Sequence, residues 1–269
     1  MKLRNTLVGI SASGLALGGL VATGTAPAMA APAAPSYTCT GGEITTHTYS
    51  SLNITGPCTV ADGATLTVLH DLTVAPGAMF DAMTHSTVTV DGNVVAGPGS
   101  LFGLGCTPAH PCEGDDSEDT STTDVVKGNV ILNQVFDAAL NGDEIDGNVV
   151  SNGGGAGLLD PETDFVPFSV KDDVIKGNLI VSHLTTVWFG VIRSEIDGNV
   201  VLSDIQLSDP DGNEVVQDTV GRNLVCHNMS PAPQLGDAVE GAPPGYGSSS
   251  VGGRGVGQCA ELPTAAPAG

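Results

Sequence analysis

Gly147-Asn148-Val149-Val150 decides the fold, because the same phrase, a Gly-Asn pair followed by two aliphatic residues, recurs along the middle of the chain. Other copies begin at Gly92, Gly128, Gly177 and Gly198, and a degenerate last copy reads Arg222-Asn223-Leu224-Val225. Successive asparagines are 36, 19, 30, 21 and 24 residues apart. Such spacing indicates one structural unit stacked on itself, with insertions of variable length.

The sequence around these repeats has the two-residue period of β-strands. Residues 65–69 and 87–90 alternate polar and apolar side chains, and Asp-Gly and Pro-Gly turns separate such runs. Aromatic residues make up only 4% of the chain, too few for a typical sandwich core. Coils that stack at about 4.8 Å need only small aliphatic side chains. We therefore predict an all-β fold, a right-handed parallel β-helix of three sheets, with about eight coils between residues 59 and 229.

The repeated asparagine has a physical reason to recur at its position. Inward-facing asparagines stacked in register can bond amide to carbonyl along the axis. The glycine before each one would permit a positive φ or a tight corner. The predicted structural ladder consists of Asn93, Asn129, Asn148, Asn178, Asn199 and Asn223. A second polar column is expected four residues later, at Asn133, Asn152, Ser182, Ser203 and His227.

The N-terminal residues 1–30 have the pattern of a signal peptide. Lys2 and Arg4 precede an apolar run, and Ala28-Met29-Ala30 offers the small residues of a cleavage site. The mature chain is expected to begin near Ala31 and to be secreted, without a membrane span.

Net charge limits the partners of this chain. The full sequence has a formal charge of −22. Removing residues 1–30 takes away two of the eight basic residues and none of the thirty acidic ones, which leaves −24. This excess argues against nucleic acid and anionic lipid as partners. It is compatible with calcium, with cationic partners or with solubility alone, and the partner stays unknown, an extracellular or cell-wall polysaccharide being one candidate.

Six cysteines lie in the predicted mature chain, and their even number in an exported protein indicates disulfides. Six cysteines allow fifteen connectivities. We expect sequential pairing, since each neighbouring pair brackets a place where the repeat is interrupted or ends. The pairs would be Cys39 with Cys58, Cys106 with Cys112, and Cys226 with Cys259.

The pattern also predicts domain boundaries. Residues 31–58 are expected to form an N-terminal cap, 59–230 the β-helix repeats, and 231–269 a Pro/Gly-rich C-terminal cap and tail. Two long insertions, 97–124 and 153–168, are expected to be loops. The first of them contains the acidic run 113–119.

The coil motifs, the ending Asn223-Leu224-Val225-Cys226 and the closing Val256-Gly257-Gln258-Cys259 resemble secreted right-handed β-helix proteins of Gram-positive bacteria, most of them uncharacterised. The resemblance covers about residues 39–259 and implies the architecture. The Gly-Asn-Val coils are more distantly similar to bactofilin-type polymer-forming proteins, from which the export signal and the cysteines distinguish this chain.

The charged and aromatic residues offer two candidate chemical sites. A polysaccharide lyase or hydrolase could use a groove lined by Trp188, Phe189, Arg193 and loop carboxylates, because an aromatic ring beside a cation can bind a sugar face. The pair Asp172-Asp173 could serve glycoside hydrolysis, but adjacent strand residues point to opposite faces.

The remaining candidates have simpler interpretations. Lys127 and Lys176 precede Gly-Asn corners and are expected to be solvated turn residues. Residues 209–214 carry oxygen ligands at alternate positions, as a calcium loop does, and also have the composition of a β-turn. No Cys-x-x-Cys pair or histidine cluster predicts another metal site.

These observations favour an exported structural or adhesive solenoid that presents acidic loops, with no catalytic residue and no cofactor assigned. A polysaccharide lyase or hydrolase is the alternative. End-to-end polymerisation is disfavoured, because disulfide-tied ends would block stacking.

Overall fold

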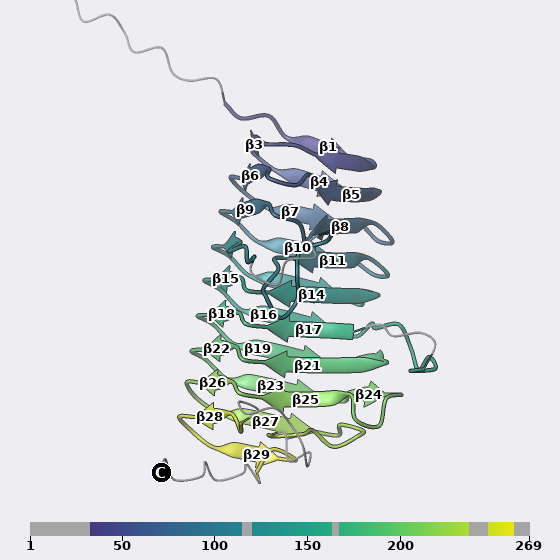
Figure 1. Ribbon diagram of the computed structural model, residues 1–269, viewed down its shortest axis with the longest axis vertical. Coiled ribbons are helices and arrows are strands. Elements are labelled where there is room, and N and C mark those ends of the chain that lie inside the picture. Colours follow the sequence, from purple (N-terminus) through teal and green to yellow (C-terminus); the bar gives the residue numbers. More distant parts are fainter. Residues whose placement is uncertain (1–32, 115–119, 163–166, 237–246, 261–269) are drawn as a thin grey trace, which may run out of the picture. The chain divides into compact units, whose positions relative to one another are not determined.

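In this computed structural model, the alternating runs form 29 short strands within the described residues, and the strands of three sheets pair only in parallel. The structure describes residues 33–114, 120–162, 167–236 and 247–260. From Ala33 onward the chain is one compact unit. Each of the first eight coils contributes one strand to each of the three sheets in turn, and the next coil stacks below it (Figure 1). The predicted three-sheet parallel β-helix is therefore confirmed.

Sheet A contains ten strands, which begin 15 to 36 residues apart along the chain. Seven of the ten begin between residues 59 and 229, against about eight expected. Its strands are β1 (Tyr37–Cys39), β4 (Leu52–Ile54), β7 (Leu72–Val74), β10 (Val94–Ala96), β13 (Val130–Asn133), β16 (Val149–Asn152), β19 (Leu179–Ser182), β23 (Val200–Ser203), β27 (Leu224–His227) and β29 (Gly255–Gly257).

Two further sheets complete the coils, and a small two-stranded sheet flanks them. Sheet B contains β2 (Gly42–Ile44), β5 (Pro57–Val60), β8 (Met79–Ala82), β11 (Leu101–Leu104), β14 (Asp137–Asn141), β17 (Pro167–Lys171), β21 (Trp188–Ile192) and β25 (Asn213–Val216). Sheet C contains β3 (His47–Tyr49), β6 (Thr65–Val68), β9 (Thr87–Val90), β12 (Val125–Val126), β15 (Glu144–Ile145), β18 (Val174–Ile175), β22 (Glu195–Ile196), β26 (Thr219–Val220) and β28 (Ser250–Val251). The small sheet pairs β20 (Thr185–Thr186) with β24 (Gln206–Leu207).

Small aliphatic side chains fill the interior, as the composition predicts. Alternate residues of each strand point inward, so that identical or similar side chains stack from coil to coil. One such column in sheet A runs through Val130, Val149, Leu179 and Val200, all at most 1% exposed. Phenylalanine rings in this interior pack in pairs, such as Phe80 over Phe102 with centroids 5.7 Å apart.

The first coil closes the N-terminal end of this core with aromatic rings. Tyr37 is in register with the buried Leu52, and Tyr49 with the buried Val68, so both rings head interior columns. The two rings stack with centroids 4.8 Å apart, and His47 packs against Tyr49 at 4.4 Å. Residues 37–58, expected as a cap, thus include strands that pair in the same three sheets as the repeats.

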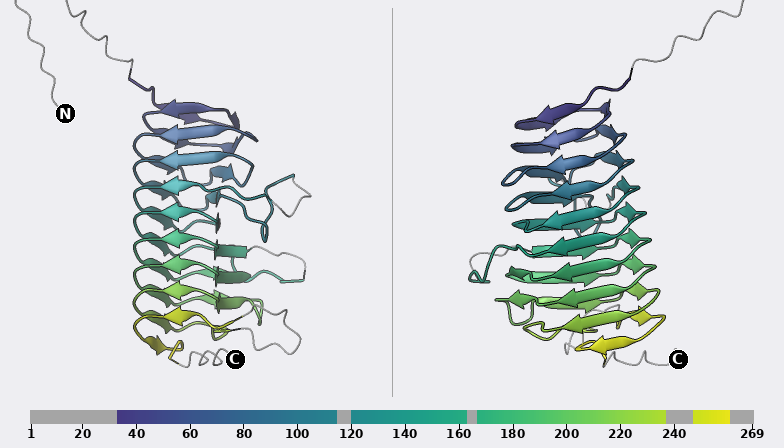
Figure 2. Two further views of the ribbon diagram at one scale, coloured as in Figure 1. Left: turned by 60° about the vertical axis from the view of Figure 1, so that its left-hand side comes forward. Right: turned by 180° about the vertical axis from the view of Figure 1, so that it is seen from behind.

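At the C-terminal end, strands also lie beyond the predicted repeat boundary at residue 230. β28 pairs with β26, and β29 pairs with β27, so the last coil extends to Gly257. Parts of the expected cap and tail, residues 237–246 and 261–269, lie outside the described residues, as do residues 1–32. Figure 2 shows the stacked coils from two further sides.

Three disulfides join the cysteines in sequential pairs. Cys39–Cys58 ties the first coil to the second and Cys226–Cys259 ties the last coils together. Both lie near the ends of the stack. Cys106–Cys112 closes a short loop on the side of the helix.

Candidate functional site

The asparagines of the repeat lie at the corner that leads into sheet A and form a continuous ladder. Each Nδ2 donates to Oδ1 of the asparagine one coil earlier, at 2.9–3.0 Å. The backbone amide of the later asparagine donates to the same oxygen, at 2.9–3.2 Å. Asp71, which the sequence analysis did not identify, heads the ladder and accepts from both nitrogens of Asn93.

The glycine before each asparagine has a different role from the one expected. None of the five Gly-Asn glycines has a positive φ. Their backbones stack instead, the amide of Gly147 donating to the carbonyl of Gly128 at 3.0 Å. A Cβ on Gly147 would lie 2.4 Å from that carbonyl oxygen. Glycine is therefore required by close contact between coils, and the positive-φ explanation is wrong.

The second polar column is also in register. Asn133, Asn152, Ser182, Ser203 and His227 occupy equivalent positions on successive sheet A strands. The Ser182 hydroxyl lies 3.1 Å from Oδ1 of Asn152. Residues that follow this column turn the chain with positive φ, among them Gln134, His183 and Asp204.

A third column, which the sequence analysis missed, lies at the corner that leads into sheet C. We call it the carboxyl column. Each member precedes a sheet C strand and is at most 7% exposed. Each member from Asp124 to Asp218 lies five residues before an asparagine of the ladder. This constant spacing is the signal in the sequence that could have revealed the column. The members are Asp124, Asp143, Asp173, Ser194, Asp218 and Ser249.

The predicted carboxylate pair of Asp172 and Asp173 does not form one site. Asp173 belongs to the buried carboxyl column and accepts from the amide of Asp143 at 2.8 Å. Asp172 lies in a positive-φ turn and binds the Arg193 guanidinium in bidentate fashion, at 2.6 and 2.7 Å. The side chains of these two adjacent residues thus point to opposite faces of the coil, one inward and one outward, as the alternation of side chains requires.

Trp188, Phe189 and Arg193 do not line a common groove. Phe189 is fully buried in the interior, where it packs on Phe168 with centroids 6.2 Å apart. Trp188 lies on the outer face of sheet B, where its ring covers Gly190. The Lys171 ammonium lies 4.6 Å from the Trp188 ring centroid.

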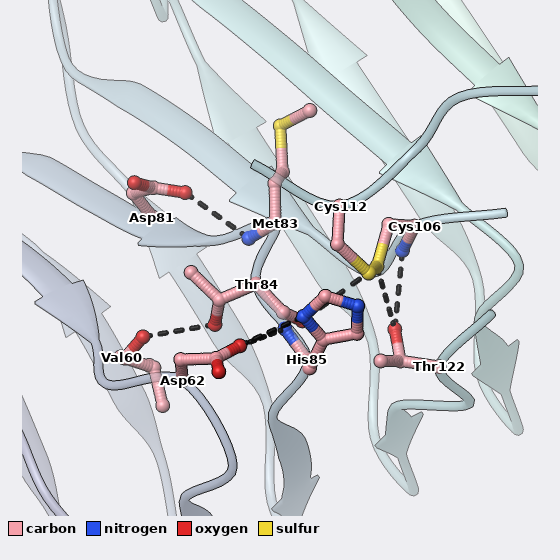
Figure 3. The surroundings of a disulfide bond; sticks show 9 residues. All are labelled: Val60, Asp62, Asp81, Met83, Thr84, His85, Cys106, Cys112 and Thr122. Atoms are coloured by element: carbon pink, nitrogen blue, oxygen red, sulfur yellow. Dashed lines mark hydrogen bonds and ion pairs between the residues drawn. A yellow bond between two sulfur atoms is a disulfide. The ribbon is translucent and has the colours of Figure 1, made fainter. Parts of the chain in front are cut away.

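A loop covers part of this outer face. We call residues 105–124 the disulfide loop, of which 115–119, most of the predicted acidic run, lie outside the described residues. We call the two ends of this loop, around Cys106 and Thr122, its neck. They are joined by a hydrogen bond from the Cys106 amide to the Thr122 hydroxyl at 3.1 Å, and the Cys106 sulfur lies against the Thr84 carbonyl (Figure 3). Further along, the Thr107 hydroxyl donates to Asp172 at 3.2 Å.

Two side chains where this loop meets sheet B, His110 of the loop and Lys171 of β17, have shifted pKa values. Burial lowers the pKa of His110 to about 4, helped by the nearby charges of Lys171 and Arg193. Burial also lowers the pKa of Lys171 to about 8, against the opposing influence of Glu214. Lys171 and Arg193 are therefore the cations beside His110, which is neutral at neutral pH. Asp172 joins them to the loop, because it binds both Arg193 and the Thr107 hydroxyl.

A shallow pocket of about 190 Å³ lies beside the loop on the outer face of sheet B. We call it the acidic pocket. Met79, Met83 and Leu101 supply apolar walls, and Asp81, Glu113 and Asp137 supply carboxyl groups. Burial raises the pKa of Asp137 to about 6. Burial and then the neighbouring Asp81 carboxyl raise the pKa of Glu113.

The other predicted candidates are involved in local contacts. Lys127 pairs with Asp91 on the preceding coil at 2.6 Å, and Lys176 pairs with Asp146 and Glu144. In the suggested calcium segment, the Asp211 amide donates to Asp209, while the Asn213 amide group donates inward to the Pro231 carbonyl. Within the described ranges, no three His, Cys, Asp or Glu side chains lie so that they could hold a metal ion.

Among the residues whose structure is described, no helix is long and apolar enough to cross a membrane. Comparison with known proteins gave no matching family model, no matching curated protein and no matching solved structure. The resemblance to exported bacterial β-helix proteins is therefore supported by the fold alone, and membership of that group stays a prediction.

Proposed function

We propose that the protein is an extracellular structural solenoid, a stiff acidic element that presents its loops to the medium or the cell surface. The observation that carries this proposal is the use of its repeated polar residues. The Asn ladder and the carboxyl column bind one coil to the next at two of the three corners, so these side chains serve cohesion of the stack.

The disulfides support an extracellular location. Disulfides form and persist in oxidising compartments. Two of the three link neighbouring coils near the ends of the stack, where fraying would begin. The expected signal peptide, residues 1–30, lies outside the described residues and agrees with the same location.

A second candidate function, glycan hydrolysis, is favoured by the acidic pocket alone. Glycoside hydrolases use a carboxylic acid that stays protonated and a second carboxylate. Glu113 and Asp137 both have raised pKa values and line one pocket. The lyase or hydrolase alternative therefore depends on this pocket, and no longer on a groove lined by Trp188 and Arg193.

Deletion of the encoding gene in the producing organism, followed by complementation, distinguishes the two functions. The informative variant combines Glu113→Gln and Asp137→Asn, which removes both acids without emptying the pocket. If the role is structural, this variant should restore the surface integrity that is lost on deletion as fully as the original sequence does. Restoration by the original sequence but not by the folded variant would overturn the structural proposal in favour of catalysis.

A folding control completes this design. Substitution of a ladder residue, Asn148→Asp, should lower the amount of folded protein and fail to complement even though the acidic pocket is intact. Full complementation by an unfolded Asn148→Asp chain would contradict a role that depends on the assembled solenoid.

A further inference from the structure

The carboxyl column places three aspartates on successive coils inside the protein. Asp124, Asp143 and Asp173 precede β12, β15 and β18, and these strands are neighbours in sheet C. Neighbouring strands lie about 4.8 Å apart, so stacked side chains at equivalent positions face one another along the axis. Each of the three residues is at most 1% exposed. Bulk solvent therefore does not screen these carboxyl groups from one another.

Several oxygens of this column have no partner. Asp124 uses Oδ1 to accept from the Val88 amide at 2.6 Å, and Asp173 uses Oδ1 to accept from the Asp143 amide. The second oxygen of each is buried without a well-directed donor, and so are both oxygens of Asp143. Backbone amides of Gly105, Asn141 and Gly142 lie near these carboxyl groups and favour their charged forms. Buried polar atoms in native proteins are nearly always bonded. A proton on one carboxyl group would satisfy an oxygen of the next.

No cation within the described structure substitutes for such protons. The charged groups around the column come from the outer side of the same wall. Asp172 acts on Asp173 and reinforces the preference for its neutral form, whereas Arg193 acts on Asp218, beyond Ser194. Asp143 faces only Asp124 above and Asp173 below. Among the described residues, no cluster of His, Cys, Asp or Glu side chains is suited to hold a metal ion.

We propose that Asp124, Asp143 and Asp173 form a chain of hydrogen-bonded carboxylic acids along the axis, and that loss of their protons opens the neck of the disulfide loop. Ser194, the next member of the column after Asp173, supplies a neutral hydroxyl group that accepts from the Asp173 amide and donates to the Ile192 carbonyl.

The upper end of this chain lies at the neck of the loop. Asp124 is the last residue of the disulfide loop, and the amide of Gly105, the first, lies close enough to favour its charge. A Cβ on Gly105 would lie 2.5 Å from Oδ1 of Asp143, so the two ends of the loop and the column are in direct contact. Repulsion between newly formed carboxylates would act on this neck, since Asp124 itself ends the loop and the strand that follows it, β12, consists of only two residues.

The direction of the pH effect follows from the shifts. Burial raises the pKa of Asp124 to about 7, and burial raises the pKa values of Asp143 and Asp173 as well, with further upward influence from their neighbours. The folded chain then holds protons that the unfolded chain has lost. The contribution of these three groups to stability is greatest at acidic pH and falls as pH rises from about 4 towards and beyond 7.

Infrared spectroscopy in heavy water tests the chain directly, because the carbonyl stretch of a protonated carboxylic acid is separated from those of carboxylates and amides. The purified, oxidised protein is compared at pH 6 with the double variant Asp143→Asn with Asp173→Asn. We expect a protonated-acid band in the original protein and a clear decrease of that band in the variant, in which Asp124, Asp137 and Asp218 still contribute. Absence of that band from the original protein at pH 6, or an equal band in both, would overturn the proposal.

Hydrogen exchange tests the release of the neck and covers the case in which the double variant folds poorly. Asp143→Ser is the second variant, because serine occupies the same column at Ser194 and Ser249. After correction for intrinsic exchange, amides around Cys106 and Thr122 should exchange at least tenfold faster at pH 8 than at pH 6 in the original protein, and less so in Asp143→Ser. Equal acceleration in all coils, or none at the neck, would contradict the proposal. Metal analysis of the same sample that found one tightly held cation per chain would also overturn it.

Discussion

The polarity of the Asn ladder leads to a quantitative prediction. The Asn148 side chain takes part in three hydrogen bonds. Its Nδ2 donates to Asn129, and its Oδ1 accepts from the amide and the Nδ2 of Asn178, each at 2.9 Å. A typical buried hydrogen bond contributes about 1 kcal/mol. Replacement of Asn148 by alanine should therefore lower the free energy of unfolding by about 3 kcal/mol.

A matched pair of substitutions separates ladder polarity from mere loss of side-chain volume. Every internal asparagine donates towards the N-terminal coil and accepts from the C-terminal one. Asp71 heads the ladder and only accepts, so a carboxylate suffices there. Asn148→Asp would instead direct a carboxylate oxygen at Oδ1 of Asn129 and should cost about 2 kcal/mol or more. Asp71→Asn should change stability by less than about 0.5 kcal/mol, since an amide oxygen accepts the same bonds.

Urea denaturation of the oxidised protein and its variants measures these differences as free energies of unfolding. A loss below about 1 kcal/mol for Asn148→Ala would show that the ladder contributes little. Equal effects of Asn148→Asp and Asp71→Asn would refute the argument from polarity, because both positions exchange the same two groups.

Three further predictions concern the corners, the disulfides and the loop. Gly147→Ala should cost about 2–3 kcal/mol in the same denaturation assay because its Cβ would meet a carbonyl oxygen at 2.4 Å, whereas Gly247→Ala, with no neighbour within 4 Å, should be nearly neutral. Equal costs would contradict the stacking explanation. Removal of the Cys226–Cys259 disulfide, which spans 33 residues, should lower the free energy of unfolding by nearly 4 kcal/mol. Removal of the Cys106–Cys112 disulfide, which spans 6 residues, should lower it by about 2 kcal/mol. The reverse order in thermal unfolding would count against this loop-entropy argument. Asp172→Ala removes the partner of Arg193 and Thr107 and should speed proteolytic cleavage within residues 105–124 while the coils stay intact; unchanged cleavage would show that this contact does not hold the loop.

The fold could be predicted because its signal is local and repeated. Each Gly-Asn-Val-Val phrase contains a corner and the start of a strand, and stacking places all copies at equivalent positions. The reason for the glycine could not be obtained in the same way. A conformational requirement and a steric requirement select the same residue, and only the 2.4 Å approach to the coil above separates them.

The candidate sites were harder to predict, because they depend on contacts between coils. Asp173 was interpreted together with its neighbour Asp172, although its true partners, Asp143 and Ser194, are 30 and 21 residues away. The acidic pocket combines Asp81, Glu113 and Asp137, whose proximity depends on how an insertion folds back over sheet B. No periodicity in the sequence reports that path.

The central claim is that the polar residues of this chain hold a structural solenoid together and do not catalyse a reaction. Release of reducing ends and unsaturated products by the purified, oxidised protein tests this claim most directly. The assay uses acidic and neutral polysaccharides, with calcium and with chelator, beside the Glu113→Gln and Asp137→Asn variants. The account predicts no release above that of the variants on any substrate. Release that depends on Glu113 or Asp137 would contradict it and identify the acidic pocket as an active site.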